Sequence, residues 1–363
     1  MNTINGEVGI VETTMNAFNF GVTFAVAIVC VIIIGCTATN GVSEHSAKSH
    51  WIHKRKVPRF GGIAILLGLI VLVFAPHPTP FDTARALLVS SIPLVLTGFS
   101  EDFGLEIKPS LRIIAGFVSG FFAVFLTGFW ITRIEVPYFD LILAIPIIAI
   151  PLSAFASTTI AHSFNLVDGL NGLCSGLSIL AFLFFGSLSL ICGDAEMLKI
   201  MILIASCVLG FWLVNVTTGK IFLGDAGAYF LGHTLAWTAI VLASRHSIIS
   251  PWALFLGLIY PVSETLITIA RRRLAGTPIS TPDKKHLHHL VYLWILNVFG
   301  LSEKFANGTT GVLILLWSAV PATIAFYNYK FSITCFLVAV VYFTANIILY
   351  RLLQNTLTMR PAP

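Results

Sequence analysis

The chain has 363 residues, of which 57% are hydrophobic and only 10% are charged, and its mean hydropathy is +0.92. A water-soluble globular protein cannot build its surface from this composition, so the bilayer is the expected solvent. The formal charge of +5 is explained by membrane topology and by attraction to anionic headgroups, and it requires no nucleic-acid partner. We therefore expect an integral membrane protein.

Eleven mainly apolar runs of about 17–25 residues follow one another along the chain, each long enough for a helix to cross a bilayer. Their hydrophobicity is continuous rather than alternating, which indicates helices and not barrel strands. The sequence therefore predicts an all-α polytopic integral membrane protein, a single domain over residues 1–363, with about 11 transmembrane helices. The expected spans cover residues 18–38, 61–77, 84–100, 113–131, 141–161, 173–192, 197–217, 227–244, 248–269, 309–327 and 332–350.

Lysine and arginine are divided unevenly between the two sets of connecting loops. One set, together with the tail from residue 351, holds 16 of the 21. Because positively charged loops stay in the cytoplasm, this bias predicts an external N-terminus and a cytoplasmic C-terminus. The last of these internal loops is long enough for a short interfacial helix around residues 286–299. The internal loops are 39–60, 101–112, 159–172, 218–226 and 270–308.

The strongest polar motif follows the fifth expected span and combines Asn165, Asp168 and Asn171 with Gly169 and Gly172. Side chains three residues apart share a helical face, and glycines let a ligand approach the backbone closely. The pattern suits a nucleotide or a sugar. In the alternative interpretation, Asp168 or Asn171 only caps the next helix.

Two internal loops offer carboxylates. Asp225 lies between Gly224 and Gly227 at the start of the eighth span, and Glu101 and Asp102 end the third. Mg²⁺ is usually held by one or two carboxylates plus substrate phosphates, so a diphosphate–metal site would fit these loops. An N-cap aspartate and a solvated acidic turn are the alternatives.

Three histidines, His286, His288 and His289, lie in the last internal loop after Lys284 and Lys285. Clustered histidine can ligate zinc. Imidazole next to lysine also binds phosphate oxygens or nucleobase edges, which we favour over zinc and over a solvated surface.

Basic residues accompany two of these motifs. Lys54, Lys56 and Arg59 lead into Gly61-Gly62, and Lys220 precedes Asp225. They are interpreted either as ligand contacts or as charges that only fix the orientation in the membrane.

Glu264 is expected inside the membrane near its internal end, where an unpaired acid is costly. We expect it to pair with Arg271 or to hydrogen bond with a loop of the site rather than to act in catalysis.

All these motifs fall on one side of the predicted membrane, which is typical of an enzyme at the bilayer interface. With the motifs in hand, the chain resembles the polyprenyl-phosphate N-acetylhexosamine-1-phosphate transferases, or glycosyltransferase family 4, which include phospho-N-acetylmuramoyl-pentapeptide transferase. The resemblance covers about residues 48–295. It rests on five motifs: His53-Lys54 with Pro58-Arg59-Phe-Gly-Gly62, the acidic pair, Asn165 to Gly172, Phe222-Leu-Gly-Asp225-Ala-Gly, and His286-Leu-His288-His289.

The histidine motif and the eleven spans resemble the branch that initiates O-antigen, enterobacterial common antigen and teichoic-acid linkage synthesis. The resemblance implies that a UDP-N-acetylhexosamine gives its sugar 1-phosphate to undecaprenyl phosphate, with release of UMP. It also implies Mg²⁺, with Mn²⁺ as an alternative, and a bacterial inner-membrane enzyme whose site faces the cytoplasm.

On this basis we assign site residues in three groups. The catalytic candidates are Asp102, Glu101, Asp225, His288 and His289, and the metal candidates among them are Asp225 and Asp102. The substrate-binding candidates are Lys54, Arg59, Asn165, Asp168, Asn171, Asn215, Lys220 and His286.

Two positions depart from the family pattern. The usual Asp-Asp pair is Glu101-Asp102 here, and Asn171 stands where the family has a second acid. The first change moves a carboxylate out by one methylene, and the second removes a negative charge near the expected nucleotide. A transporter or lipid flippase is the rival from another class, but transporters keep their polar sites near the membrane midplane. An inactive family member is a second rival, and a homodimer is left open.

Overall fold

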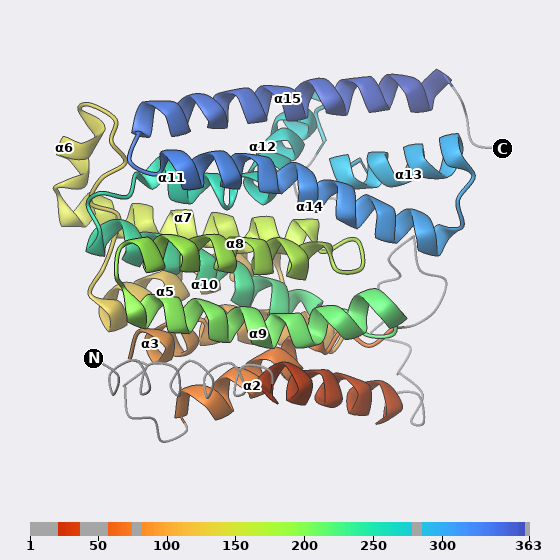
Figure 1. Ribbon diagram of the computed structural model, residues 1–363, viewed down its shortest axis with the longest axis horizontal. Helices are drawn as coiled ribbons and strands as arrows, with labels where there is room; N and C mark the ends of the chain where they lie inside the picture. The colour runs from red at the N-terminus through yellow and green to blue at the C-terminus, as the bar shows by residue number, and fades with distance from the viewer. Residues whose placement is uncertain (1–20, 37–56, 75–81, 278–284, 360–363) are drawn as a thin grey trace, which may run out of the picture.

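The structure is a computed structural model and describes residues 21–36, 57–74, 82–277 and 285–359. Every regular element in these residues is a helix (Figure 1). One helix covers Gly21–Cys36. The others are α2 (Gly61–Phe74), α3 (Asp82–Ser90), α4 (Ile92–Asp102), α5 (Pro109–Thr127), α6 (Phe139–Leu143), α7 (Pro146–Val167), α8 (Leu173–Ile191), α9 (Ala195–Thr218), α10 (Gly224–Arg245), α11 (Pro251–Leu256), α12 (Ile259–Leu274), α13 (Leu287–Phe299), α14 (Glu303–Asn328) and α15 (Ser332–Met359).

The helical, polytopic class predicted from the sequence is confirmed. Among the described residues, seven helices are long and apolar enough to cross a membrane, and an eighth span results if α3 and α4 count as one. The described part of each of the eleven expected runs falls on one helix or on two consecutive helices. The count of eleven spans and the orientation stay predictions. The helix expected around residues 286–299 is confirmed as α13.

Local sequence signals set the helix boundaries. Pro109 and Pro146 occupy the first turns of α5 and α7, where the missing N–H has no intrahelical partner to lose. Gly128 ends α5 with φ of +73°, a left-handed conformation that glycine adopts without strain. These signals place α5 about four residues earlier than the hydrophobic run suggested.

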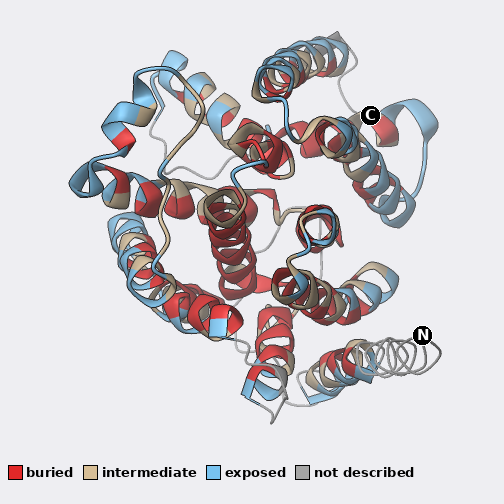
Figure 2. Cartoon of the chain, turned by 60° about the vertical axis from the view of Figure 1, so that its left-hand side comes forward, coloured by how far each residue is buried: buried red, intermediate tan, exposed pale blue. Residues whose placement is uncertain are grey.

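Helix α10 forms the axis of the bundle. In an 18-residue apolar stretch of α10, 89% of the residues are buried, whereas the corresponding share in α15 is only 22%. Figure 2 shows a buried central helix surrounded by helices with exposed outer faces. Small residues let its neighbours approach: a Cβ on Gly98 of α4 would lie 2.5 Å from Ala226 Cα, and one on Gly232 would lie 2.6 Å from Ala161 Cα of α7. Such contacts are typical of helices packed in a membrane.

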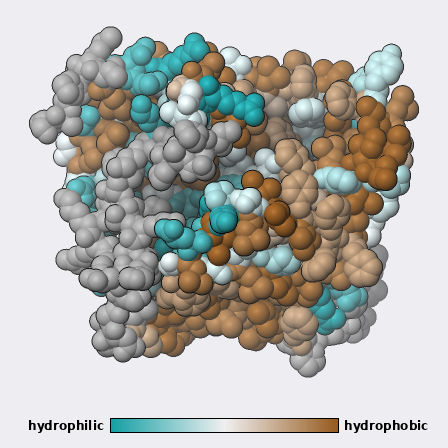
Figure 3. Space-filling view, turned by 180° about the vertical axis from the view of Figure 1, so that it is seen from behind, coloured by the Kyte–Doolittle hydropathy of each residue, from teal (hydrophilic) through white to brown (hydrophobic). Residues whose placement is uncertain are grey.

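The outer faces are apolar. Phe125 of α5 is 84% exposed and Ile147 of α7 is 82% exposed, and hydrophobic atoms cover most of the face shown in Figure 3. In water these exposed apolar side chains would promote aggregation, but in a bilayer they contact lipid.

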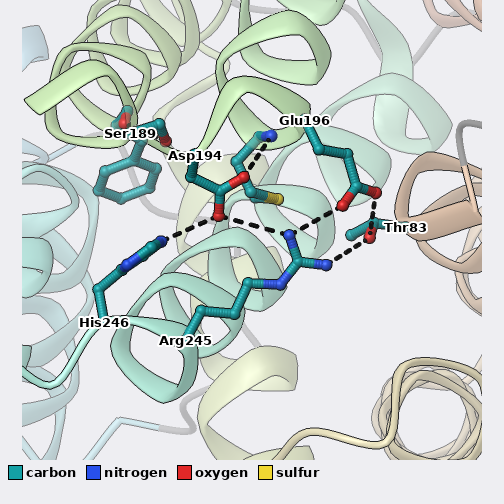
Figure 4. Close-up of polar contacts among 8 residues, drawn as sticks. Thr83, Ser189, Asp194, Glu196, Arg245 and His246 are labelled. Atoms are coloured by element: carbon teal, nitrogen blue, oxygen red, sulfur yellow. Dashed lines mark hydrogen bonds and ion pairs between the residues drawn. The ribbon is translucent and has the colours of Figure 1, made fainter. Parts of the chain in front are cut away.

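An ionic network closes the end of the bundle at which α9 begins and α10 ends (Figure 4). Arg245 of α10 lies 3.0 Å from Glu196 and 3.4 Å from Asp194, and its other nitrogen donates to Thr83 of α3 at 2.9 Å. His246 contacts Asp194 at 2.9 Å. The network fastens α3, α9 and α10 together at the end opposite the predicted site.

Candidate active site

Two segments far apart in sequence pair through their backbones at the other end of the bundle, on the right in Figure 1. The N–H groups of Gly61 and Gly62 each donate at 2.8 Å, to the carbonyls of Phe222 and Leu223, and Phe222 N–H donates to Pro58 at 2.9 Å. Two of the sequence motifs are thereby joined. A Cβ on Gly62 would lie 2.6 Å from the Gly227 backbone, so this contact requires glycine.

Asp102, the last residue of α4, caps the helix that carries Asp225. Its Oδ1 accepts from the Asp225 N–H at 2.9 Å and its Oδ2 accepts from the Ala226 N–H at 3.1 Å. A carboxylate at a helix N-terminus satisfies free N–H groups and is favoured by the helix dipole. Asp102 is only 1% exposed. The solvated acidic turn considered from the sequence is therefore wrong for this residue.

Arg59 lies between the two aspartates. Its Nε is 3.3 Å from Asp102 Oδ1, and its Nη2 makes a close ion pair with Asp225 Oδ1. Burial acts to lower the pKa of Arg59, but the charges of Asp225, Asp102 and Asp168 outweigh it and raise the pKa above its ordinary value. The guanidinium therefore stays charged and is the cation of this site.

Asn165 is a second partner of Asp225. Its Nδ2 donates to Asp225 Oδ1 at 3.0 Å. Asn165 lies in the last turn of α7, so the same carboxylate joins α7, α10 and the segment before α2.

Glu101 has a different partner from its neighbour. Arg112, in the first turn of α5, donates to Glu101 Oε2 at 2.9 Å, and the Glu101 side chain is only 4% exposed. The longer glutamate thus reaches a guanidinium on the next helix, which gives a structural reason for this departure from the family pattern.

The loop after α7 is held by two asparagines from other elements. Asn215 of α9 accepts from the Gly172 N–H at 2.6 Å and donates to the Ile221 carbonyl at 2.6 Å. Asn307 of α14 accepts from the Asn171 N–H at 3.1 Å. The helix-cap alternative for Asp168 and Asn171 is therefore wrong: Gly172 occupies the N-cap position of α8 without a side-chain cap, and its N–H bonds to Asn215.

Asp168 ends α7 and lies beside the charged groups of the site. Burial raises the pKa of its carboxyl to about 7, with Arg59 opposing the rise and Asp225 adding to it. A recess lined by Asp168, Asn171, Asn215 and Phe222 adjoins this loop. Asn171 also lines a second cavity, of about 660 Å³, between the end of α9 and the start of α14.

The histidine motif packs against this loop. A Cβ on Gly169 would lie 2.8 Å from His289 Nε2 and 3.0 Å from His288 Nε2, so only glycine leaves room for the rings. Glu264 of α12 accepts from the Leu287 N–H at 3.0 Å and lies 3.6 Å from His286 Nδ1. The predicted hydrogen bond from Glu264 to a loop of the site is thus confirmed.

The histidines are buried, with exposures of 6%, 0% and 7% for His286, His288 and His289. The solvated-surface interpretation is therefore wrong. Burial, and then the two neighbouring imidazoles, lower the pKa of His288 well below its ordinary value. Its Nε2 has no hydrogen-bond partner among the described residues. His288 is consequently a neutral imidazole whose free nitrogen faces the loop after α7.

Comparison with known proteins shows the family to which the chain belongs. A model of glycosyl transferase family 4 matches residues 84–243. The chain is 30% identical over 260 residues to the Bacillus subtilis (strain 168) protein named "Probable undecaprenyl-phosphate N-acetylglucosaminyl 1-phosphate transferase", and the match covers 70% of each chain.

The chain belongs to glycosyl transferase family 4. It is also 27% identical over 303 residues to "Phospho-N-acetylmuramoyl-pentapeptide-transferase" of Staphylococcus carnosus (strain TM300), covering 77% of this chain and 90% of that one. The protein of the same name from Staphylococcus aureus (strain MSSA476) is 28% identical over the same coverage.

In this family 4 protein, the structure brings together most of the predicted site residues. Lys220 is exposed on the turn after α9, while Lys54 and His53 lie outside the described residues. Among the described residues, no group of three or more His, Cys, Asp and Glu side chains is arranged to hold a metal ion. The residues with direct or loop-mediated contacts at the site are Arg59, Glu101, Asp102, Asn165, Asp168, Asn171, Asn215, Asp225, His286, His288 and His289.

Sequence reasoning missed two contributors, Arg112 and Asn307. Arg112 was counted only as a charge of the internal loops, although its distance of 11 positions from Glu101 fits a turn between two helices. Asn307 lies beyond the stretch that resembles the family, and nothing in its surroundings marks it as a partner of residue 171.

Proposed function

We propose that this protein transfers an N-acetylhexosamine 1-phosphate from a UDP-sugar to undecaprenyl phosphate, giving the undecaprenyl-diphosphate sugar and UMP. One observation carries the proposal: Arg59, Asp102, Asn165 and Asp225 converge at one end of the bundle, beside the loop that contacts His288 and His289. The names of the relatives, which refer to undecaprenyl phosphate and to N-acetylhexosamine derivatives, support the choice of substrates.

The proposed reaction needs no protein nucleophile. An oxygen of the lipid phosphate, already anionic, forms a bond to the β-phosphorus of the UDP-sugar. The bond between that phosphorus and the bridging oxygen breaks, and UMP leaves with the electron pair. Such transfers depend on positioning and on neutralising charge, which fixed cations and hydrogen-bond donors supply.

Asp225 is the residue best suited to hold Mg²⁺ or Mn²⁺. Its side chain is 15% exposed, whereas that of Asp102 is 0% exposed and has both oxygens occupied by backbone N–H groups. One carboxylate plus substrate phosphates is an ordinary arrangement for Mg²⁺. The bound cation would neutralise the diphosphate charge. Asp102 would then act by holding the start of α10 and the Arg59 guanidinium.

Arg59 and the histidines would serve the phosphates. When a cation takes Asp225, the Arg59 guanidinium loses that partner, and a phosphate oxygen is the group that replaces it best. His288 is neutral, so its free nitrogen is suited to a hydrogen bond rather than to an ion pair. We also propose that the site faces the cytoplasm, where UDP-sugars are made, in agreement with the distribution of lysine and arginine.

The test uses the full chain purified in detergent with undecaprenyl phosphate, Mg²⁺ and a panel of UDP-sugars. We expect UMP release and a lipid-linked sugar phosphate with UDP-N-acetylglucosamine or a related N-acetylhexosamine. Removing the metal with a chelator should stop both products, and adding Mg²⁺ or Mn²⁺ should restore them.

Two outcomes would contradict the proposal. Release of UMP without lipid product would indicate hydrolysis, and movement of substrate across vesicles without UMP would indicate transport. Glucose and N-acetylglucosamine donors compared side by side show whether the acetamido group is required. The product then decides the pathway, and we favour the branch that initiates O-antigen, common antigen and teichoic-acid linkage synthesis.

A further inference from the structure

A histidine inside the membrane bundle joins α10 to α7 and to the end of α3. His233 lies in α10, eight positions after Asp225, which corresponds to about 12 Å along a helix. Its Nε2 is 3.0 Å from Ser90 Oγ at the end of α3, and its Nδ1 is 3.1 Å from Ser157 Oγ of α7. His233 is 0% exposed, Ser90 0% and Ser157 1%.

The partners of Ser90 define the direction of these bonds. The Ser90 hydroxyl donates to the Leu87 carbonyl at 3.1 Å, so its oxygen is left to accept from the imidazole. His233 therefore donates through Nε2–H, and in the neutral ring Nδ1 accepts the Ser157 hydroxyl proton. Each ring nitrogen has one partner.

The position of Ser90 is special because α3 and α4 are bent by 48° at this point. Pro93 lies in the first turn of α4, and the Leu94 N–H donates to Ser119 Oγ of α5 at 3.1 Å instead of to a helical carbonyl. The break is thus stabilised from two sides, by Ser119 and by His233. Beyond the break, α4 ends at Asp102.

Ser157, the other partner of His233, lies on α7 at a level that matches that of His233 on α10. Ser157 precedes Asn165 by eight positions, just as His233 follows Asp225 by eight. Between these levels, α10 packs closely on α7 through Gly232 and Ala161 and on α4 through Gly98 and Ala226. His233 therefore links α10, which bears Asp225, directly to α7, which bears Asn165, and to the end of α3 at the break before α4, which bears Asp102.

We propose that His233 is a positioning residue for the transferase reaction, which sets the register of α10 against α4 and α7 and thereby the placement of Asp225 relative to Asp102 and Asn165. This rests on the proposed function. A polar side chain inside a membrane is costly and is expected where it has a role. Displacements of about 1 Å at a reacting centre can reduce a rate by about 100-fold.

The experiment compares His233→Leu with Thr234→Val in the full chain in detergent. Thr234 is the next residue of α10, equally buried, and its hydroxyl has no hydrogen-bond partner among the described residues. We expect His233→Leu to lower kcat at least tenfold with the UDP-sugar KM within twofold, and Thr234→Val to leave both unchanged. His233→Asn and His233→Gln, which each keep a donor and an acceptor, should recover part of kcat.

A merely structural role would give another result. If His233→Leu lowers the unfolding temperature but the folded fraction keeps wild-type kcat, the proposal is overturned. If His233→Leu does not fold, Ser90→Ala and Ser157→Ala each remove one hydrogen bond of His233 and should lower kcat severalfold. Full activity in both variants overturns the proposal.

A readout without turnover separates this inference from the proposed function. Spin labels at Leu105 and Lys220, both exposed near the site, report the distance between the loop after α4 and the turn that leads into α10. We expect His233→Leu to shift or broaden the distance distribution and Thr234→Val to preserve it. An unchanged distribution in His233→Leu contradicts the positioning role even if the wild type shows no transferase activity.

Discussion

Asp102 caps the helix on which Asp225 lies, with both carboxylate oxygens accepting backbone N–H groups at 2.9 and 3.1 Å. The two acids therefore have different tasks although they share Arg59. Asp102 holds the framework, and Asp225 is the carboxylate left to meet a ligand.

This difference predicts that two similar substitutions differ in their effect on stability. Asp225→Asn should abolish turnover at ordinary Mg²⁺ with little change in unfolding temperature. Asp102→Asn should lose activity and also destabilise the fold, by about 1–2 kcal/mol for the lost cap, because its amide nitrogen cannot accept from an N–H. Activity assays and thermal unfolding in detergent check both, and equal stability of the two variants would contradict the capping role.

The pairing of Glu101 with Arg112 predicts that restoring the family's aspartate harms this enzyme. Glu101→Asp shortens the side chain by one methylene and should break the 2.9 Å contact, lowering kcat severalfold. Arg112→Ala should have a similar effect. Because each variant removes the Glu101–Arg112 contact, the double variant should lose less than the product of the two single losses. Additive losses would show that the pair acts through separate partners.

The close approach of the histidine motif to Gly169 predicts a steric effect. Gly169→Ala should push the rings of His288 and His289 from the loop, because the added Cβ would lie within 3.0 Å of both. We expect at least a tenfold loss of activity. Gly308→Ala in α14 is the matched control: no atom lies within 4 Å of its added Cβ, and alanine should slightly stabilise the helix. Comparable losses in both variants would exclude the steric explanation.

The raised pKa of Asp168 predicts how stability depends on pH. The folded protein holds this proton up to about pH 7, whereas an unfolded aspartate loses it near pH 3.9. Between these values the folded state binds more protons, so this group makes the protein less stable as pH rises. Asp168→Asn should flatten the fall in unfolding temperature between pH 5 and 7. If Asp168→Asn shows the same dependence of unfolding temperature on pH as the wild type, another group causes that dependence.

The positions of the helices could be predicted because apolar runs of membrane-spanning length have one common solution in lipid. The number of apolar runs between the polar motifs also predicted that these motifs lie at the same end of the bundle. The breaks could not be predicted, since the run over 84–100 hides the bend between Ser90 and Ile92, and the run over 248–269 hides the interruption between α11 and α12. The first break is stabilised by side chains from other helices, His233 and Ser119.

The site was foreseen as a set of residues but not as a set of contacts. Asp225 and Asp102 were recognisable as acids, yet the capping role of Asp102 depends on where α4 ends relative to α10. Arg112 and Asn307 required knowledge of which loops touch. Helical periodicity identifies residues on one face of one helix, and it contains no information about the partner across the interface.

The backbone bonds from Gly61 and Gly62 to Phe222 and Leu223 also have a consequence for biosynthesis. Arg59 meets Asp225 only after 166 further positions have been made. During translation, the early segment enters the bilayer long before its acceptor carbonyls exist. The catalytic end must therefore assemble late, after most of the spans are already in the membrane, and truncated products ending before residue 223 would lack it.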